Sequence, residues 1–195
     1  MASKASLKIM SVALCALCIS CVVEEREKDI TSYRSSRPDV DIARLEKKIH
    51  AQINEERKKK NLSTLLWDEG LHEVARKHSD DMERRNFFSH DDPEGRSFYD
   101  RYQSAGYECR IRTGTAIYMG AENISQDNLY SSTLYRNGET FFDWKTEDEI
   151  AASVVKRWMQ SRGHRENILT PYFKREGIGV SLSRDGKVYV TENFC

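Results

Sequence analysis

The sequence lacks a net charge, although charged side chains are abundant. Its 31 Lys and Arg residues are balanced by 31 Asp and Glu residues, so the formal net charge at pH 7 is zero. Proteins that bind nucleic acids usually carry a surplus of basic residues that neutralises phosphates. The balance therefore argues against a nucleic-acid partner, and the composition is that of an ordinary soluble domain.

The sequence also lacks an apolar run long enough to cross a bilayer comfortably, because a membrane-spanning helix needs about 20 apolar residues. The longest run, at 9–23, is IMSVALCALCISCVV and follows Lys4 and Lys8. A basic start followed by an apolar segment of this length is typical of a secretory signal peptide. We therefore predict that residues 1–23 direct export and that the mature chain is extracytoplasmic.

Cys21 closes this apolar run and follows Ser20, a small residue. The arrangement resembles the lipobox of bacterial and archaeal lipoproteins, in which the cysteine becomes the lipidated first residue. Cys18 stands where a lipobox usually has leucine, so the match is incomplete. We predict lipidation of Cys21 and anchoring to the cell envelope. The alternatives are secretion after cleavage of an ordinary signal peptide, or an uncleaved anchor; no other membrane contact is expected.

Cysteine is scarce outside this leader. Of the five cysteines, Cys15, Cys18 and Cys21 belong to the leader, which leaves Cys109 and Cys195 in the exported chain. Exported proteins meet oxidising conditions, in which such a pair commonly forms a disulfide. We predict a disulfide between Cys109 and Cys195, with two unpaired thiols as the alternative.

One domain is expected at 40–195, after a polar linker at 24–39 that shows no apolar period. Apolar residues recur at helical spacing at 42–53, at 71–82 and at 150–158. Asp68 is a suitable N-cap for the second of these helices, and Thr146 with Glu149 forms a capping box for the third. A shorter helix is expected at 97–105, and Gly163 is the expected left-handed C-cap after the third helix.

Two hairpins are expected in the second half of the chain. Asn137-Gly138 marks a turn within 125–146, a long connection that we expect to be a surface excursion. The stretches GIGVSLS and KVYVTENF alternate as strands do around the turn Arg184-Asp185-Gly186. Helices on both sides of a small antiparallel sheet indicate mixed α/β layering and not a doubly wound fold.

Three residues are candidates for a shared site: His90, Glu122 and His164. Each is expected where a helix or strand has just ended, a position from which side chains can converge on a cleft. Two imidazoles and a carboxylate suffice to bind zinc and leave a fourth position open for water or substrate. The sequence therefore predicts a divalent metal site, with a buried polar network that fastens loops together as the alternative.

The other histidines are expected to be structural or solvated. His78 falls on the apolar stripe of its helix, which predicts a packed core residue. His50 and His72 fall among charged residues on their helices, which predicts solvated side chains.

Four motifs in order connect these residues to a family. They are NEERKKKNLSTLLWDEGLHEVARKHSDDMERRNFFSH, GAENI, SVVKRWMQSRGHRENILTPYFKREGIGV and the closing KVYVTENF. Together they resemble the prokaryotic branch of the CAP superfamily, which comprises cysteine-rich secretory, antigen 5 and pathogenesis-related 1 proteins (the SCP domain). The resemblance covers about residues 42–195. It implies an α+β fold, a three-layer α-β-α sandwich with a small, mainly antiparallel central sheet and a central cleft.

In eukaryotic members of this family two histidines and two glutamates line the cleft, and some members bind a divalent metal there. His90, Glu122 and His164 match three of these positions. Ser161 stands three residues after Trp158, where the family has its second glutamate. The resemblance thus implies a His-Glu-His site without a pair of carboxylates for acid and base catalysis.

The sequence favours a non-catalytic binding module, exported and holding a divalent metal such as zinc or another small ligand in its cleft. A metal-dependent hydrolase resembling a protease is one alternative, although no serine or cysteine nucleophile arrangement is evident. A cell-surface interaction or lipid-binding protein is another, with the aromatic residues of 125–146 as its contact surface. Substrate and partner are not indicated.

Overall fold

The computed structural model describes residues 32–195, so the predicted signal peptide and Cys21 lie outside the described part of the chain. The described residues form five helices, which are α1 (Ile42–Lys58), α2 (Glu69–Arg85), α3 (Phe98–Ser104), α4 (Glu147–Gln160) and α5 (Arg162–Ile168). Their nine strands form one four-stranded sheet, one three-stranded sheet and one two-stranded hairpin.

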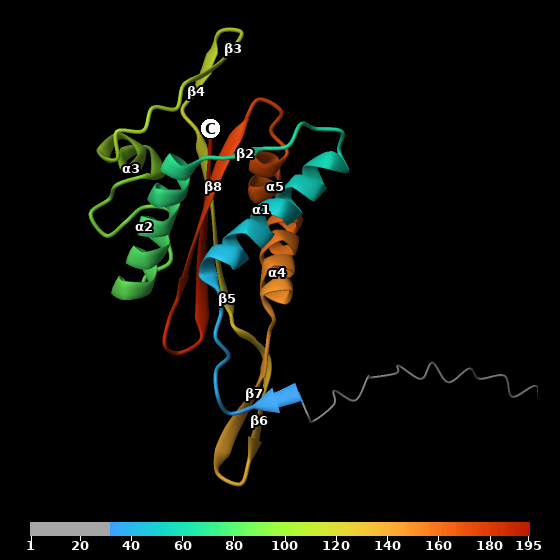
Figure 1. Cartoon of the computed structure of the whole chain (residues 1–195). Helices are drawn as coiled ribbons and strands as arrows, with labels where there is room; N and C mark the ends of the chain where they lie inside the picture. The colour runs from blue at the N-terminus through green and yellow to red at the C-terminus, as the bar shows by residue number, and fades with distance from the viewer. Residues whose placement is uncertain (1–31) are drawn as a thin grey trace, which may run out of the picture.

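The four-stranded sheet is the centre of the fold. Its strand order is β2-β8-β9-β5, with bounds β2 (Leu66–Trp67), β8 (Arg175–Leu182), β9 (Lys187–Phe194) and β5 (Ala121–Asn128). All pairs are antiparallel except β2 with β8. Helices α2 and α3 lie on one side, and α1, α4 and α5 lie on the other (Figure 1). The expected three-layer α-β-α sandwich is confirmed.

Two glycines of β8 let α2 pack directly on the sheet. A Cβ atom at Gly177 would lie 2.0 Å from the backbone nitrogen of His72, and one at Gly179 would lie 2.1 Å from that of Arg76. No side chain fits at either position, because the helix backbone occupies the space. The alternate residues Ile178 and Val180 face the opposite side, where they join the main apolar core beneath α1 and α4.

The helices begin where local sequence signals predicted. Asp68 Oδ1 accepts a hydrogen bond from the backbone nitrogen of Leu71 at 3.0 Å and caps α2. The Thr146–Glu149 capping box is present at the start of α4. These caps supply partners to backbone N–H groups that the first turn of a helix leaves unpaired.

The prediction for Gly163 was wrong. Helix α4 ends at Gln160 because Ser161 takes up an extended conformation, with φ −82° and ψ 129°. Helix α5 begins at the next residue, so Gly163 lies within its first turn and is absent from the positions with positive φ. His164 is therefore a helical residue and not part of a turn.

The hairpin predicted at Asn137-Gly138 is confirmed. It joins β6 (Tyr130–Arg136) to β7 (Glu139–Trp144), and the two turn residues have φ values of 54° and 85°. This hairpin projects from the body of the domain (Figure 1). Positive φ at both turn residues gives the twist that a two-residue hairpin loop needs.

The segment predicted as a linker contributes a short strand. β1 (Tyr33–Arg34) pairs with β7 in antiparallel fashion, and Trp144 Nε1 donates to the carbonyl of Arg34 at 3.1 Å. A two-residue strand has no apolar period, so the sequence pattern gave no sign of it.

The predicted disulfide between Cys109 and Cys195 is confirmed, with 5.6 Å between the Cα atoms. It joins the segment before β3 (Ile111–Thr113) and β4 (Ala116–Tyr118) to the end of β9. Both cysteines are buried beside Leu71, Val74 and Tyr102, so the bond ties the C-terminus to the α2 side of the sheet.

Candidate functional site

The structure brings His90 and Glu122 into contact. Glu122 is the second residue of β5, and its side chain is 1% exposed. His90 follows α2 in a loop, is 51% exposed, and places its Nδ1 3.0 Å from Glu122 Oε1. A buried carboxylate thus meets an imidazole that is open to solvent. Glu122 lies near the start of a strand, and not after its end as predicted.

Arg101 makes a second ion pair with this carboxylate. This residue of α3 donates through Nη2 to Glu122 Oε2 at 2.6 Å, and its side chain is only 11% exposed. Its Nη1 donates to the carbonyls of His90 and Arg96 at 3.0 and 2.9 Å. Arg101 therefore neutralises Glu122 and also holds the loop that carries His90.

Arg101 was missed at the level of the sequence. It is one of three arginines between positions 95 and 111, and no motif separates it from the other two. Ser97 and Asp100 form the capping box of α3 and thereby fix the start of the helix that carries Arg101. That signal predicts the helix, but only the packing of α3 against β5 identifies the carboxylate it meets.

His164 approaches the site from the other side of β5. It lies on α5, half-buried, and its pKa is lowered by burial and next by the nearby His90 imidazole. The lowered pKa favours the neutral ring at pH 7, the form that can coordinate a metal or accept a hydrogen bond. The two imidazoles predicted to converge are thus close enough to influence one another.

Two amide side chains fasten α5 to β5. Asn123, which is fully buried, donates to the carbonyl of His164 at 3.2 Å. Asn167 donates to the carbonyl of Glu122 at 3.3 Å and to Asn123 Oδ1 at 2.9 Å. The relative position of Glu122 and His164 therefore depends on this pair of amides.

As placed, the residues do not form a metal shell with three ligands. Within residues 32–195, no group of three or more His, Cys, Asp and Glu side chains has the arrangement that holds a metal ion. Both oxygens of Glu122 are already engaged, one by His90 and the other by the guanidinium of Arg101. A guanidinium in direct contact competes with a metal cation for the same carboxylate.

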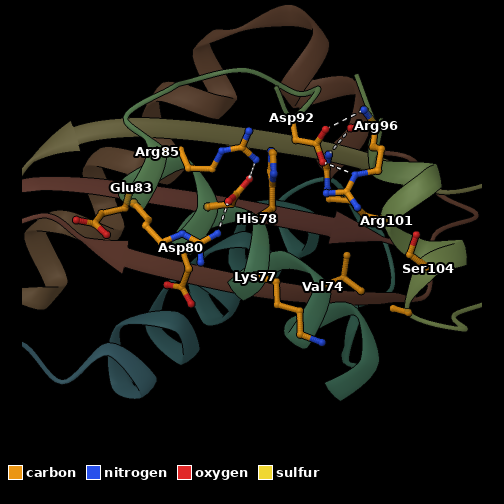
Figure 2. A pocket seen from close by; sticks show the side chains of 13 residues that line it. Val74, Lys77, His78, Asp80, Glu83, Arg85, Asp92, Arg96, Arg101 and Ser104 are labelled. Carbon is orange, nitrogen blue, oxygen red and sulfur yellow. Dashed lines mark hydrogen bonds and ion pairs between the residues drawn. The ribbon is translucent and has the colours of Figure 1, made fainter. Parts of the chain in front are cut away.

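A cavity of about 630 Å³ adjoins the site (Figure 2). It lies between α2 and the segment that leads into α3, and Arg101 lines it. Both acidic and basic side chains surround it, including the ion pairs of Arg85 with Asp81 and of Arg96 with Asp92. Because Arg101 contacts Glu122 as well, the cavity and the imidazole site share one wall.

The predictions for the other histidines have mixed outcomes. His78 is 1% exposed, and its Nε2 lies 3.1 Å from the Ser89 carbonyl, which confirms a packed core residue. The prediction that His50 and His72 are solvated was wrong. His50 Nδ1 lies 2.5 Å from the buried Glu176, and His72 Nδ1 lies 2.7 Å from the carbonyl of Ile178. Long-range partners on β8 override the polar appearance of their helices.

Comparison with known proteins agrees with this fold. The sequence model of the Cysteine-rich secretory protein family (CAP) matches residues 50–194, which is most of the chain. The chain belongs to this family. The CAP superfamily resemblance inferred from the motifs is thereby confirmed.

Two bacterial proteins are related over most of the chain. The uncharacterized protein YkwD of Bacillus subtilis is 34% identical over 170 residues, which is 87% of this chain and 52% of YkwD. The uncharacterized membrane protein YlbC of the same species is 29% identical over 149 residues, which is 76% of this chain and 34% of YlbC. The CAP chain thus spans about half of one relative and about a third of the other.

Solved structures share the fold. An extracellular protein containing an SCP domain from Bacillus anthracis has a TM-score of 0.57 and 27% identity, over 82% of this chain and 44% of that one. An outer surface protein from Borrelia burgdorferi also has a TM-score of 0.57, with 18% identity, over 82% of this chain and 97% of its own. Within residues 32–195, every helix is too short or too polar to span a bilayer.

Proposed function

We propose that this CAP protein is an exported binding module whose cleft at His90, Glu122 and His164 holds a small ligand or a divalent metal without turning it over. Export is supported by the basic and apolar leader at 1–23 and by the extracellular relative from Bacillus anthracis. The observation that carries the binding proposal is the contact between the buried Glu122 and the half-exposed His90. A fixed carboxylate orients an imidazole that a ligand can reach.

Lipidation of Cys21 is part of the proposal for export. Cleavage before Cys21 would remove residues 1–20 and leave the polar segment from 24 onward between the anchor and the domain. Mass spectrometry of protein taken from its native cells provides the test. A lipid-modified Cys21 at the N-terminus is expected, whereas an intact Met1 on protein recovered in aqueous buffer contradicts the proposal.

The arrangement argues against acid and base catalysis. A pair of carboxylates is a common arrangement for general acid and base chemistry at neutral pH. The only carboxylate in the described contacts of the site is Glu122, and Arg101 holds it as an ion pair. Ser161, at the family's second glutamate position, is the extended residue between α4 and α5. Binding without hydrolysis is therefore the favoured function.

If the ligand is a divalent metal, its binding depends on the ion pair between Arg101 and Glu122. Zinc prefers neutral imidazoles and carboxylates as ligands, so His90 and His164 supply two suitable donors. Glu122 supplies a third donor, but its ion pair with Arg101 competes with a metal cation for the carboxylate charge. Removing the guanidinium should therefore strengthen zinc binding, whereas a ligand that uses the imidazoles alone should be unaffected by this change.

Isothermal titration calorimetry with zinc at pH 7.5 tests this proposal. Wild type is expected to bind in a way that depends on histidine, so that His90→Ala and His164→Ala each weaken the affinity at least tenfold. Arg101→Gln is the informative variant and should bind zinc more tightly than wild type. His72→Ala is the matched control, since its ring contacts the backbone of β8 on a different part of the sheet.

The same preparations should be assayed with peptide, ester and phosphoester substrates in the presence of zinc. Absence of turnover together with histidine-dependent binding supports the module. Turnover that His90→Ala abolishes would favour the hydrolase instead. Zinc affinity that is equal in wild type and both histidine variants would make the site a structural polar network.

A further inference from the structure

Two glutamates are fully buried at the centre of the sheet, away from the site. Glu176 on β8 and Glu192 on β9 are both 0% exposed. Glu192 pairs with Ile178 on one side and with Asn123 on the other, so its side chain shares the α1 face of the sheet with both residues. Two ionised carboxylates cannot lie together in such an apolar setting without a large free-energy cost.

The contacts of the pair leave one oxygen of each carboxyl without a partner. Glu176 Oε1 lies 2.5 Å from His50 Nδ1, and Glu192 Oε2 accepts from Asn123 Nδ2 at 2.9 Å. The remaining oxygens, Glu176 Oε2 and Glu192 Oε1, have no hydrogen-bond partner within the described residues. Glu176 pairs with Phe194 and Glu192 pairs with Ile178, so the two side chains lie diagonally across β8 and β9 on one face of the sheet. Because an ionised carboxylate only accepts hydrogen bonds, these two oxygens can pair with each other only if one of the carboxyls carries a proton.

Asn123 connects this pair to the site. The same amide nitrogen that donates to Glu192 also donates to the carbonyl of His164, at 3.2 Å. Its oxygen accepts from Asn167, which in turn binds the carbonyl of Glu122. A single buried side chain thus contacts the carboxyl pair, the helix of His164 and, through Asn167, the strand of Glu122.

We propose that Glu176 and Glu192 are positioning residues that share one proton and, through Asn123, set the spacing between Glu122 and His164, so that the site responds to pH from the opposite face of the sheet. Loss of the shared proton places two negative charges side by side. Glu192 then attracts the Asn123 amide more strongly and weakens its bond to the His164 carbonyl. This inference rests on the proposed function, because it takes Glu122 and His164 as parts of the binding site.

The groups around the pair come from several elements. Helix α1 supplies His50 and Arg57, with Lys47 acting on His50, while β5 supplies the neutral amide of Asn123. Helix α4 packs here with apolar side chains such as Val154 and Trp158, and α5 presents the backbone carbonyl of His164. On the far side of β8, Gly177 lies against the backbone of α2.

Burial raises the pKa of Glu176 to about 7, against the lowering effects of the neighbouring Glu192 and Arg57 side chains. Burial, and next the charge of Glu176, raise the pKa of Glu192 well above its usual range. Burial lowers the pKa of His50, and the charge of Lys47 adds to this effect. These directions agree with a neutral imidazole beside a carboxyl pair that keeps a proton at neutral pH.

A carboxyl whose pKa is higher in the folded than in the unfolded state binds more protons when folded. Its contribution to stability is complete below the ordinary value of 4.5 and is lost as pH rises through the folded value, about 7 for Glu176. Between these two pH values, each carboxyl of this kind makes the unfolding equilibrium constant rise about tenfold for every unit by which the pH increases.

Denaturant unfolding of the full chain between pH 5.5 and 8.5 tests the shared proton. Glu192→Gln keeps the shape and can donate to Glu176 at every pH. Below pH 7, the unfolding constant of this variant should rise with pH less steeply than that of wild type, by a factor of about ten per pH unit. Glu176→Gln is the second variant, and Glu139→Gln, exposed in the β6–β7 hairpin, is the control that should match wild type. Equal pH dependence in wild type and both buried variants would overturn the shared proton.

NMR titration of the ligand-free chain tests the positioning role. In wild type, the Asn123 side-chain amide and the backbone amides of Glu122 and His164 should share an inflection that Glu192→Gln abolishes. Asn123→Ala should remove it from Glu122 and His164 while the pH dependence of unfolding remains. Identical titration of these amides in wild type and Glu192→Gln would overturn the positioning role. No ligand is added, so failure here is distinct from failure of zinc binding in calorimetry.

Discussion

The two faces of the central sheet both bury polar side chains, but they use them differently. On the α1 face, Asn54, Arg57, Glu176 and Glu192 are buried, and their contacts are with other protein groups. On the α2 face, Glu122 is equally buried but meets an imidazole that is half exposed. Neighbouring residues of one strand, Glu122 and Asn123, point to these two environments. The proposed binding site is thus the place where a buried carboxylate meets a half-exposed partner.

Arg57 illustrates the closed network of the α1 face. Its guanidinium is fully buried and donates to four backbone carbonyls, which belong to Ser63, Ile168, Thr170 and Phe173. Asn54 exchanges two hydrogen bonds with the backbone of Leu65. These contacts join α1 to the loops before β2 and before β8.

The largest loss of stability is expected from the disulfide. Cys195→Ala with Cys109→Ala opens a loop of 86 residues, which the chain-entropy argument values at about 4–5 kcal/mol. The loss should affect the whole domain, because the bond ties the C-terminus to α2 and α3. Urea denaturation measures it. Equal unfolding free energies for wild type and the double variant would contradict the expectation.

The second largest effect is expected at Arg57. Arg57→Met keeps much of the side-chain volume but leaves the four carbonyls without their donor, which should cost about 3–5 kcal/mol in the free energy of unfolding. Arg57→Lys keeps the charge without the planar fork and should recover only part of this loss. A change below about 0.5 kcal/mol in Arg57→Met would show that the α1 network is not structural.

The smallest stability effect is expected at His90. Its ring is 51% exposed, and Glu122 keeps the Arg101 ion pair when the ring is removed. His90→Ala should therefore change the free energy of unfolding by less than about 1 kcal/mol. Thermal and urea unfolding of the same sample measure this change. A loss as large as that of Arg57→Met would make the two faces alike and identify His90 as a structural residue.

Local signals predicted the fold well. The caps at Asp68 and Thr146 and the turn at Asn137-Gly138 depend on neighbours within a few residues, so the sequence contains all that they need. The family motifs predicted that His90 and Glu122 meet, which spacing alone could not. The helix break at Ser161 was missed because glycine is the commoner signal for a helix end.

The unpredicted parts of the site depend on contacts between distant elements. Arg101 reaches Glu122 only through the packing of α3 beside β5. Glu176 and Glu192 occur in stretches that alternate as ordinary strands do, and only the pairing of β8 with β9 makes them neighbours. His50 was misjudged for the same reason, since its partner Glu176 lies 126 positions further along the chain.

The five histidines allow the most direct test of the difference between the faces. Long-range ¹H–¹⁵N NMR spectra of the imidazole rings should be recorded at pH 7.5 while zinc is added to the purified chain. The rings of His90 and His164 are expected to shift together, whereas the more buried rings of His50, His72 and His78 are expected to stay unchanged. Shifts confined to His50 or His72, or no shift in any ring, would contradict the account.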